Sequence, residues 1–309
     1  MPDPSPDWII DVGAGMNVGL AGIGPVGWGV VVFLVVLAMV SVGLARNPLD
    51  WSRLRFVERV LRFIPGRLDA AAARLRTRLG ISGAAMAAGV AGVLLVGALA
   101  VGFTALLDDV LEGEGFAQFD NSIAHWLAGH REVWLTKVLL GVTRLGNTDA
   151  QTVWLVLVCV VAAALARSWV PVVVGVAGGG GIAVVIVIAK TLVGRQRPAL
   201  PYAVMPVNGF SFPSGHATGA AAVGLLGAWM LCRWAVRRWP AQVAVWAATI
   251  GMIGLIGFSR CYLGVHFVTD VLAGWLLGAA WAGSVILLAS WWSRATSPAR
   301  GSARLDALS

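Results

Sequence analysis

The chain has 309 residues, of which 58% are hydrophobic and only 12% are charged. Soluble globular domains carry roughly 25% charged residues, so this composition excludes an ordinary soluble domain. The net charge of +8 is compatible with a nucleic-acid partner, but most basic residues lie beside hydrophobic runs, where they report membrane topology. We therefore expect a membrane-spanning protein that contacts lipids and binds no nucleic acid.

Seven hydrophobic runs approach or exceed the length needed to cross a hydrocarbon core of about 30 Å. They are Val26–Leu44, Ala84–Leu107, Ala150–Ala166, Trp169–Ala189, Ala217–Cys232, Ala241–Ser259 and Val271–Ser293. The sequence has no alternation of apolar and polar residues that would indicate strands. It therefore predicts an all-α, polytopic membrane helical bundle.

The basic residues predict the orientation of this bundle. Sixteen of the 23 Lys and Arg residues fall on one side if the seven runs alternate in direction, and nine of these lie between Arg46 and Arg78. Short cytoplasmic loops are enriched in Lys and Arg. Residues 1–25 should then form an exoplasmic tail, and residues 294–309 a cytoplasmic tail.

The beginning of the chain carries two distinct segments. Residues 26–45 are predicted to be a transmembrane helix. The Arg-rich segment 46–80 has apolar residues at Leu54, Val57, Leu61 and Ile64, a roughly helical spacing that suits an amphipathic helix on the anionic inner leaflet. A solvated connector that follows the same charge bias explains the pattern equally well.

Three features that often mark a site are better explained by structure here. His125 and His130 are five residues apart and do not share a helix face, so we expect interfacial residues and no metal ligation. The Gly178–Gly181 run lies within a hydrophobic run and favours close helix contact or a local bend. Cys261 is expected to be a small buried thiol, and the three cysteines suggest no disulfide framework.

His266 and Asp270 form the first candidate for chemistry. They are four residues apart, so on a helix they share one face and can hydrogen-bond. A carboxylate on one ring nitrogen fixes the tautomer and leaves a lone pair on the other, as a nucleophilic imidazole needs. Taken alone, the pair fits a structural contact at a helix start better.

The second candidate is the stretch Pro213-Ser214-Gly215-His216, immediately before the fifth run. Free backbone N–H groups at a helix start attract anions. Ser214 can add its hydroxyl, Gly215 permits close backbone approach, and His216 can protonate a leaving oxygen. An ordinary helix cap is the alternative.

The third candidate is a set of cations. Lys190 and Arg197 are seven residues apart, about two helical turns, so they could face the same way, although Gly194 can interrupt that helix. With Arg260 they supply three positive groups, which suits a tetrahedral phosphate. Arg195 lies one position off this face and is a weaker candidate.

Together these clusters resemble the signature of the phosphatidic acid phosphatase type 2 (PAP2) family, which shares its site with vanadium haloperoxidases. The matching residues are Lys190-x6-Arg197-Pro198, Pro213-Ser214-Gly215-His216 and Ser259-Arg260-x5-His266-x3-Asp270, with no departure. Phe119-Asp120 and Thr143–Gly146 also look like the family's less specific upstream stretch. The resemblance implies a six-helix phosphatase domain over residues 81–293, with the first helix as an addition.

The resemblance also implies a mechanism. His266 would attack phosphorus, Asp270 would orient it, and His216 would protonate the leaving group, by way of a phosphohistidine. The substrate phosphate would be held by Lys190, Arg197, Ser214, Gly215 and Arg260. No metal or other cofactor is required, since these cations neutralise the phosphate. Because His266 must be neutral and His216 protonated, we expect a bell-shaped pH profile.

A site at the outer mouth of a helix bundle favours a lipid phosphate whose tails stay in the bilayer. An isoprenyl diphosphate such as undecaprenyl diphosphate, phosphatidylglycerol phosphate and phosphatidate all remain candidates. We expect hydrolysis at the periplasmic or extracellular face of the cell membrane. A phosphotransferase, and a non-catalytic protein that binds or transports lipid phosphates, are the alternatives. The sequence predicts no oligomeric state.

Overall fold

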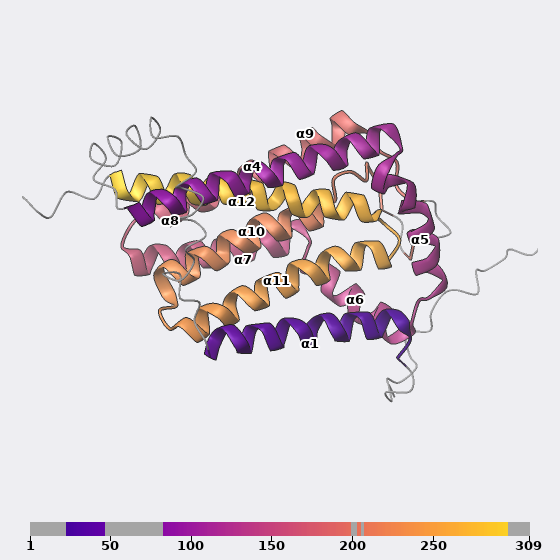
Figure 1. Ribbon diagram of the computed structural model, residues 1–309, viewed down its shortest axis with the longest axis horizontal. Coiled ribbons are helices and arrows are strands. Elements are labelled where there is room, and N and C mark those ends of the chain that lie inside the picture. The colour runs from indigo at the N-terminus through magenta and orange to yellow at the C-terminus, as the bar shows by residue number, and fades with distance from the viewer. Residues whose placement is uncertain (1–22, 47–82, 199–202, 205–206, 296–309) are drawn as a thin grey trace, which may run out of the picture.

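A computed structural model describes residues 23–46, 83–198, 203–204 and 207–295. The regular elements in this part of the chain are all helical (Figure 1). The longer ones are α1 (Pro25–Arg46), α4 (Gly83–Glu112), α5 (Asp120–Gly129), α6 (Val133–Arg144), α7 (Thr148–Ala166), α8 (Val170–Gly175), α9 (Gly181–Val193), α10 (Gly215–Met230), α11 (Trp239–Tyr262) and α12 (Val268–Ala295). Short turns η3 (Gly115–Phe119), η4 (Val176–Gly180) and η6 (Leu231–Ala235) join or extend them.

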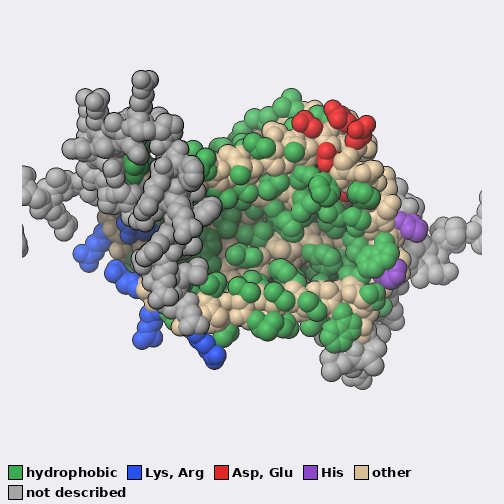
Figure 2. All heavy atoms as spheres, in the orientation of Figure 1, with side chains coloured by type: hydrophobic (Ala, Val, Ile, Leu, Met, Phe, Trp, Pro, Cys, Tyr) green, Lys and Arg blue, Asp and Glu red, His purple; other side chains and the backbone are tan. Residues whose placement is uncertain are grey.

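The seven predicted membrane crossings are confirmed. Within the described residues, seven helical segments are long and apolar enough to span a bilayer: Pro25–Arg46, Ala88–Glu112, Thr148–Ala166, Val170–Val193, Gly215–Ala235, Trp239–Tyr262 and Val268–Ser293. Hydrophobic side chains cover the middle of the visible surface (Figure 2), as expected of a surface that faces lipid tails. The chain is therefore a multi-pass membrane protein with an all-α fold.

Helix α10 is the centre of the bundle and packs against α12, α11 and α7. Its sequence is rich in Ala and Gly, and most of its side chains are buried. The facing glycines of α12 permit a close approach: a Cβ at Gly274 would lie 3.0 Å from the Ser214 carbonyl oxygen. Small residues at such a seam let two backbones come together, which fixes the start of α10 against the start of α12.

The glycine run lies in an irregular part of the fourth span. Residues Val176–Gly180 form a π-type turn between α8 and α9. Gly178 lies against Leu226 of α10, and the Trp281 indole N–H donates to the Gly178 carbonyl at 2.9 Å. The prediction of close helix contact at this run is confirmed.

Helix α1 lies along one edge of the bundle and packs on α11 (Figure 1). The Glu132 carboxylate accepts hydrogen bonds from the N–H groups of Gly24 and Gly27, both at 2.9 Å, at the start of α1. At the other end, the Trp239 indole N–H donates to the Leu44 carbonyl at 2.8 Å. Polar contacts therefore hold α1 at both ends.

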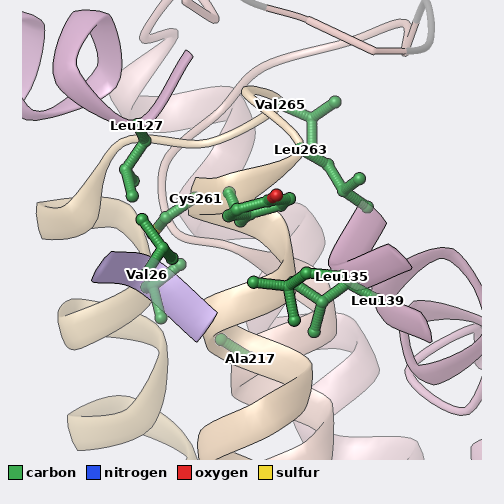
Figure 3. Close-up of a cluster of buried hydrophobic side chains, with 10 residues drawn as sticks. Val26, Leu127, Leu135, Leu139, Ala217, Cys261, Leu263 and Val265 are labelled. Carbon is green, nitrogen blue, oxygen red and sulfur yellow. The ribbon is translucent and has the colours of Figure 1, made fainter. Parts of the chain in front are cut away.

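A hydrophobic cluster fills one end of the bundle, where α1, α5, α6, α10 and α11 meet (Figure 3). Its buried members are Val26, Leu127, Leu135, Leu139, Ala217, Cys261, Tyr262, Leu263, Val265 and Val271. Cys261, Tyr262, Leu263 and Val265 of this cluster lie between Arg260 and His266, so the cluster supports the turn that carries them.

The two ends of the bundle differ in charge. Basic side chains gather at one end of the view and acidic ones at the other (Figure 2). The described basic residues at the ends of spans include Arg46, Arg167, Arg233, Arg237 and Arg238, while Lys190 and Arg260 lie in the last turns of α9 and α11. The predicted tails at residues 1–25 and 294–309 lie largely outside the described residues. Of the Arg-rich segment 46–80, only Arg46 is described.

Candidate functional site

Lys190 and Arg197 are not brought together by helical spacing. Helix α9 ends at Val193 because Gly194 adopts a left-handed conformation (φ 64°) and donates its N–H to the Lys190 carbonyl. Gly194 therefore interrupts the helix, and Arg197 lies in the loop that follows. Of the two alternatives that the sequence left open, the structure shows the interruption at Gly194, and the loop after it carries Arg197 into the site.

His266 lies in the turn between α11 and α12. Gly264, with φ 71°, allows this turn to fold back, and the N–H groups of Val265 and His266 donate to the Arg260 carbonyl at 3.1 and 3.3 Å. The turn thus holds His266 beside Arg260. The imidazole is almost fully buried, with 2% of its surface exposed.

Each ring nitrogen of His266 has a defined partner. Nδ1 lies 3.3 Å from Asp270 Oδ2, and Nε2 lies 3.0 Å from Arg197 Nη1. A guanidinium can only donate, so Nε2 accepts with its lone pair and Nδ1 carries the hydrogen toward Asp270. The predicted contact with Asp270 is present, although His266 precedes α12. Asp270 also accepts from the Phe267 N–H at 2.9 Å.

The surroundings favour a neutral His266. Burial lowers the pKa of His266 to about 4, and the hydrogen bond to Asp270 offsets this only in part. Burial also lowers the pKa of Arg197, while a guanidinium remains charged at neutral pH. A neutral imidazole beside a fixed cation is the state that an attacking nitrogen requires.

Lys190 and Arg197 are both anchored on the loop that precedes α10. Lys190 Nζ donates to the carbonyls of Phe210 at 2.6 Å and Ser211 at 3.4 Å. Arg197 Nε donates to the Gly209 carbonyl at 2.9 Å, and its Nη2 to the Phe210 carbonyl at 3.3 Å. The Phe210 carbonyl is the shared acceptor, and it brings the two positive groups to one place.

Arg260 has an unfilled donor. Its side chain is buried, and Nη1 donates to Thr143 Oγ1 at 2.8 Å. Nε has no hydrogen-bond partner among the described residues, although it is buried. A buried polar group without a partner is costly and needs an explanation. An anionic ligand that supplies an oxygen would provide one.

The start of α10 completes the arrangement. Ser214 caps the helix, its hydroxyl accepting from the Ala217 N–H, and its own N–H donates to the Asp270 carbonyl at 3.0 Å. Gly215 lies beside Lys190, since a Cβ there would be 3.8 Å from Lys190 Cε. The predicted binding residues therefore converge at the N-terminus of a helix, where N–H groups favour anions.

His216 faces a residue that sequence reasoning missed. Its Nε2 lies 2.9 Å from Asn147 Oδ1, and its backbone carbonyl accepts weakly from Gln151 at 3.4 Å. An amide oxygen only accepts, so His216 Nε2 carries a hydrogen. His216 is also close enough to His266 and Arg260 to interact with them electrostatically. Asn147 follows the Thr143–Gly146 stretch, which was the only signal for it.

Arg195 does not belong to the cationic set. It was a weak candidate for phosphate binding, but its Nη1 lies 2.6 Å from Asp270 Oδ1 and its Nη2 lies 2.8 Å from Asp120 Oδ2. Asp120 is buried, with 2% of its surface exposed. Arg195 thus connects two carboxylates behind His266. The sequence indicated Asp120 only through its place in the upstream stretch.

The remaining features have structural explanations. Within the described residues, no three His, Cys, Asp or Glu side chains are grouped so that they could hold a metal ion. His130 stacks on the Trp126 ring at 4.4 Å and bonds to its backbone carbonyl. Cys261 is a buried free thiol, as predicted, and the other two cysteines are also free.

Comparison with known proteins gives relatives that are phosphatases by name. Phosphatidylglycerophosphatase B from Bacillus subtilis is 33% identical over 162 residues, which are 48% of this chain and 72% of the relative. Decaprenylphosphoryl-5-phosphoribose phosphatase from Mycobacterium tuberculosis is 33% identical over 134 residues, which are 41% of this chain and 66% of that protein.

The fold is also found in a solved structure, a transmembrane PAP2-type phosphatidylglycerolphosphate phosphatase from Bacillus subtilis. The two share a TM-score of 0.59 and 26% identity, over 66% of this chain and 98% of the other. The sequence model described as the PAP2 superfamily matches residues 168–294, which contain all three polar clusters. The resemblance read from the motifs is confirmed, and the chain belongs to the PAP2 superfamily.

Proposed function

We propose that this protein is a membrane lipid phosphatase that hydrolyses a lipid phosphomonoester or diphosphate through a phosphohistidine on His266. One observation carries the proposal. His266 turns the lone pair of Nε2 toward a cation at 3.0 Å while its Nδ1 is held by a buried carboxylate. The same groups that would hold a phosphate therefore surround a nitrogen that can attack it.

In the first step, Arg197, Lys190 and Arg260 bind the phosphate oxygens together with the Ser214 hydroxyl and the Gly215 N–H. Arg197 then donates to a phosphate oxygen in place of Nε2, which frees the lone pair. Nε2 of His266 forms a bond to phosphorus as the bond to the leaving oxygen breaks. The cations stabilise the equatorial oxygens, where charge is greatest, and Asp270 stabilises the imidazolium.

His216 supplies the proton for this step. It is close enough to Arg260, His266, Arg197 and Lys190 to interact with them electrostatically, and it is oriented by Asn147. A proton passes from His216 to the leaving oxygen, which departs as an alcohol or a phosphate ester. In the second step the now neutral His216 takes a proton from water, the water oxygen bonds to phosphorus, and the P–N bond breaks. Inorganic phosphate leaves, and both histidines regain their initial states.

The charge of the site supports a reaction without a metal ion. Lys190, Arg197 and Arg260 together can neutralise a phosphate that carries about two negative charges. Each is anchored by neutral acceptors, namely backbone carbonyls or the Thr143 hydroxyl. Their charge therefore remains available to a ligand. Turnover should persist after treatment with a chelator.

The position of the site supports a lipid substrate at the exoplasmic face. The site lies at the start of α10 and the end of α11, whereas Arg233, Arg237 and Arg238 lie at the opposite ends of these two helices. Such flanking Arg residues favour the cytoplasmic side. Both named relatives act on phosphates attached to lipids, as their names state. We further propose that residues 81–293 form the phosphatase domain and that α1 is an addition to it.

The central experiment measures phosphate release by the purified protein. The panel holds phosphatidylglycerol phosphate, phosphatidate and undecaprenyl diphosphate, each with chelator or vanadate in parallel. His266→Ala should abolish turnover, whereas His130→Ala, a histidine that stacks on Trp126, should not. Acid-labile, base-stable label on the protein from a ³²P-labelled lipid would identify the phosphohistidine. Normal turnover by His266→Ala would contradict the mechanism, and release that requires an added acceptor would indicate a phosphotransferase.

Sidedness has its own test. Asn208 and Arg237 are exposed residues on loops at opposite ends of the bundle. In a Cys232→Ala background, Asn208→Cys should react with an impermeant maleimide on intact cells, whereas Arg237→Cys should react only after permeabilisation. The reverse pattern would place the site on the cytoplasmic side.

A further inference from the structure

Two carboxylates and one guanidinium form a buried network behind His266. Arg195 Nη1 lies 2.6 Å from Asp270 Oδ1, and its Nη2 lies 2.8 Å from Asp120 Oδ2. The three residues come from the α9–α10 loop, the start of α5 and the first turn of α12. Asp120 is 75 residues from Arg195 along the chain, as is Asp270. The network therefore ties three distant segments together.

The network fixes both oxygens of Asp270. Oδ1 accepts from Arg195, while Oδ2 accepts from the Phe267 N–H and faces His266 Nδ1. The Arg195 guanidinium is itself held in place, since it lies 4.4 Å from the centre of the Phe267 ring. A carboxylate held at both oxygens can present Oδ2 to the imidazole in only one orientation.

Asp120 is held as firmly. Its Oδ1 accepts from the Thr269 N–H at 3.1 Å, and its Oδ2 accepts from the Thr269 hydroxyl as well as from Arg195. Thr269 immediately precedes Asp270, so Asp120 also fixes the backbone that carries the catalytic carboxylate. The position of Asp120 is thus coupled to that of Asp270 by two routes.

The charges of the network do not cancel. Two carboxylates and one guanidinium leave a net charge of −1 when all are ionised. The other charged or titratable groups that act on His266 are Arg197 from the loop, Arg260 from α11 and His216 from α10, and each of them is positive when charged. Without Asp120, Arg195 would neutralise Asp270, and His266 would become a cation in entirely positive surroundings. Asp120 therefore preserves one negative charge next to the nucleophile.

We propose that Arg195 and Asp120 are positioning residues for the nucleophile: Arg195 orients Asp270 toward His266, and Asp120 balances the charge of Arg195 so that Asp270 can stabilise the phosphohistidine cation. The inference rests on the proposed function, because it assigns roles in the same reaction. Neither residue touches the substrate phosphate. The simpler alternative is a structural tie between α5 and α12 that has no part in the chemistry.

The two accounts differ in the pH profile of single-residue variants. Asp120→Asn removes a negative charge, so it should lower the pKa of His266 and move the acid limb of kcat/KM to lower pH. Arg195→Gln removes a positive charge and should move the same limb to higher pH. In the double variant the two changes cancel, and the limb should return near its original position. If the substitutions only loosened the packing around His266, water would enter the site. The pKa of His266, and with it the acid limb, would then rise in every variant toward the ordinary histidine value.

The experiment compares these three variants with Asp108→Asn, the same change at an exposed residue at this end of the molecule. We expect kcat to fall roughly 10- to 100-fold in each single variant, the range seen when outer-shell partners are lost. The binding of vanadate should change little, because the phosphate ligands remain. The double variant should lose less than the product of the single effects, since its residues act as one unit.

Several outcomes would overturn the inference. Shifts of the acid limb in the same direction for Asp120→Asn and Arg195→Gln would favour the structural tie. Fully multiplicative losses, or a fall in vanadate binding that matches the fall in kcat, would do the same. His266→Ala is measured alongside: turnover by that variant refutes the proposed function itself. If His266→Ala is inactive while the Asp120 and Arg195 variants keep wild-type kinetics, only the inference is refuted.

Discussion

Arg260 offers the sharpest test of the phosphate site. Its Nε is buried without a partner among the described residues, and its Nη1 is bound to Thr143. Arg260→Met removes the charge and the empty donor while it keeps most of the side-chain volume. Arg260→Lys keeps the charge but loses the planar fork, and Thr143→Val removes only the supporting hydroxyl. The three variants therefore separate the contribution of the charge, of the planar guanidinium and of the hydroxyl that positions it.

The expected magnitudes differ by more than the error of a kinetic assay. A preorganised donor aimed at transition-state charge contributes about 2.7–4 kcal/mol, so Arg260→Met should lower kcat/KM roughly 10²- to 10³-fold. Loss of one ordinary hydrogen bond amounts to about 0.5–1.5 kcal/mol, so Thr143→Val should lower it only about 2- to 10-fold. Arg260→Lys should fall between them, because Lys cannot replace a bidentate Arg.

The assay is phosphate release from a lipid phosphate in detergent micelles, with vanadate inhibition as a separate measure of anion binding. Arg260 bonds a neutral hydroxyl and keeps one buried donor without a partner among the described residues, so Arg260→Met leaves no opposite charge unpaired and the melting temperature should remain close to that of the wild type. If Thr143→Val lost as much activity as Arg260→Met, Arg260 would act through packing. If Arg260→Met kept its affinity for vanadate, the empty donor would have no part in anion binding.

Three further predictions concern His216, His266 and α1. Asn147→Ala should slow phosphohistidine formation from a substrate with a poor alkyl leaving group by roughly tenfold or more but leave the burst of p-nitrophenol from p-nitrophenyl phosphate nearly unaffected, because in this first step His216 is needed only where the leaving oxygen requires a proton. Since burial lowers the pKa of His266 to about 4 and the neutral ring attacks, the acid limb of kcat/KM should lie well below pH 6; a limb near 6.5 would argue against this. Glu132→Gln should lower stability in detergent by about 1–2 kcal/mol, because α1 loses the carboxylate at its N-terminus, whereas the exposed Glu114→Gln should have little effect in the same thermal melt.

Much of the site could be read from the sequence because its parts are short and local. The spacing of His266 and Asp270 predicts their contact, and Ser214 precedes an apolar run as a helix cap does. The apolar runs likewise predict all seven spans. In each case the physical cause lies within a few residues, so a pattern in the sequence is enough.

The remaining parts depend on contacts that no local pattern reveals. From the sequence Arg195 is only a weak candidate for phosphate binding, and its carboxylate partners cannot be predicted because they lie 75 residues away in both directions. Asn147 and His216 are 69 residues apart. Lys190 and Arg197 do meet at the Phe210 carbonyl, but through a loop, because the left-handed Gly194 ends the helix between them. Side-chain pairs across a bundle are set by packing, which spacing alone does not give.

The described residues form seven spans, so the start of α1 and the end of α12 lie at opposite ends of the bundle. Helix α1 begins beside Glu132, at the end of the bundle that carries His266, whereas α12 runs from the site toward the opposite end (Figure 1). A purification tag or a surface tether attached after residue 295 would therefore lie at the end of the bundle opposite the site, where it would not obstruct an entering headgroup. The same tag placed before residue 23 would crowd that mouth and compete with incoming lipid.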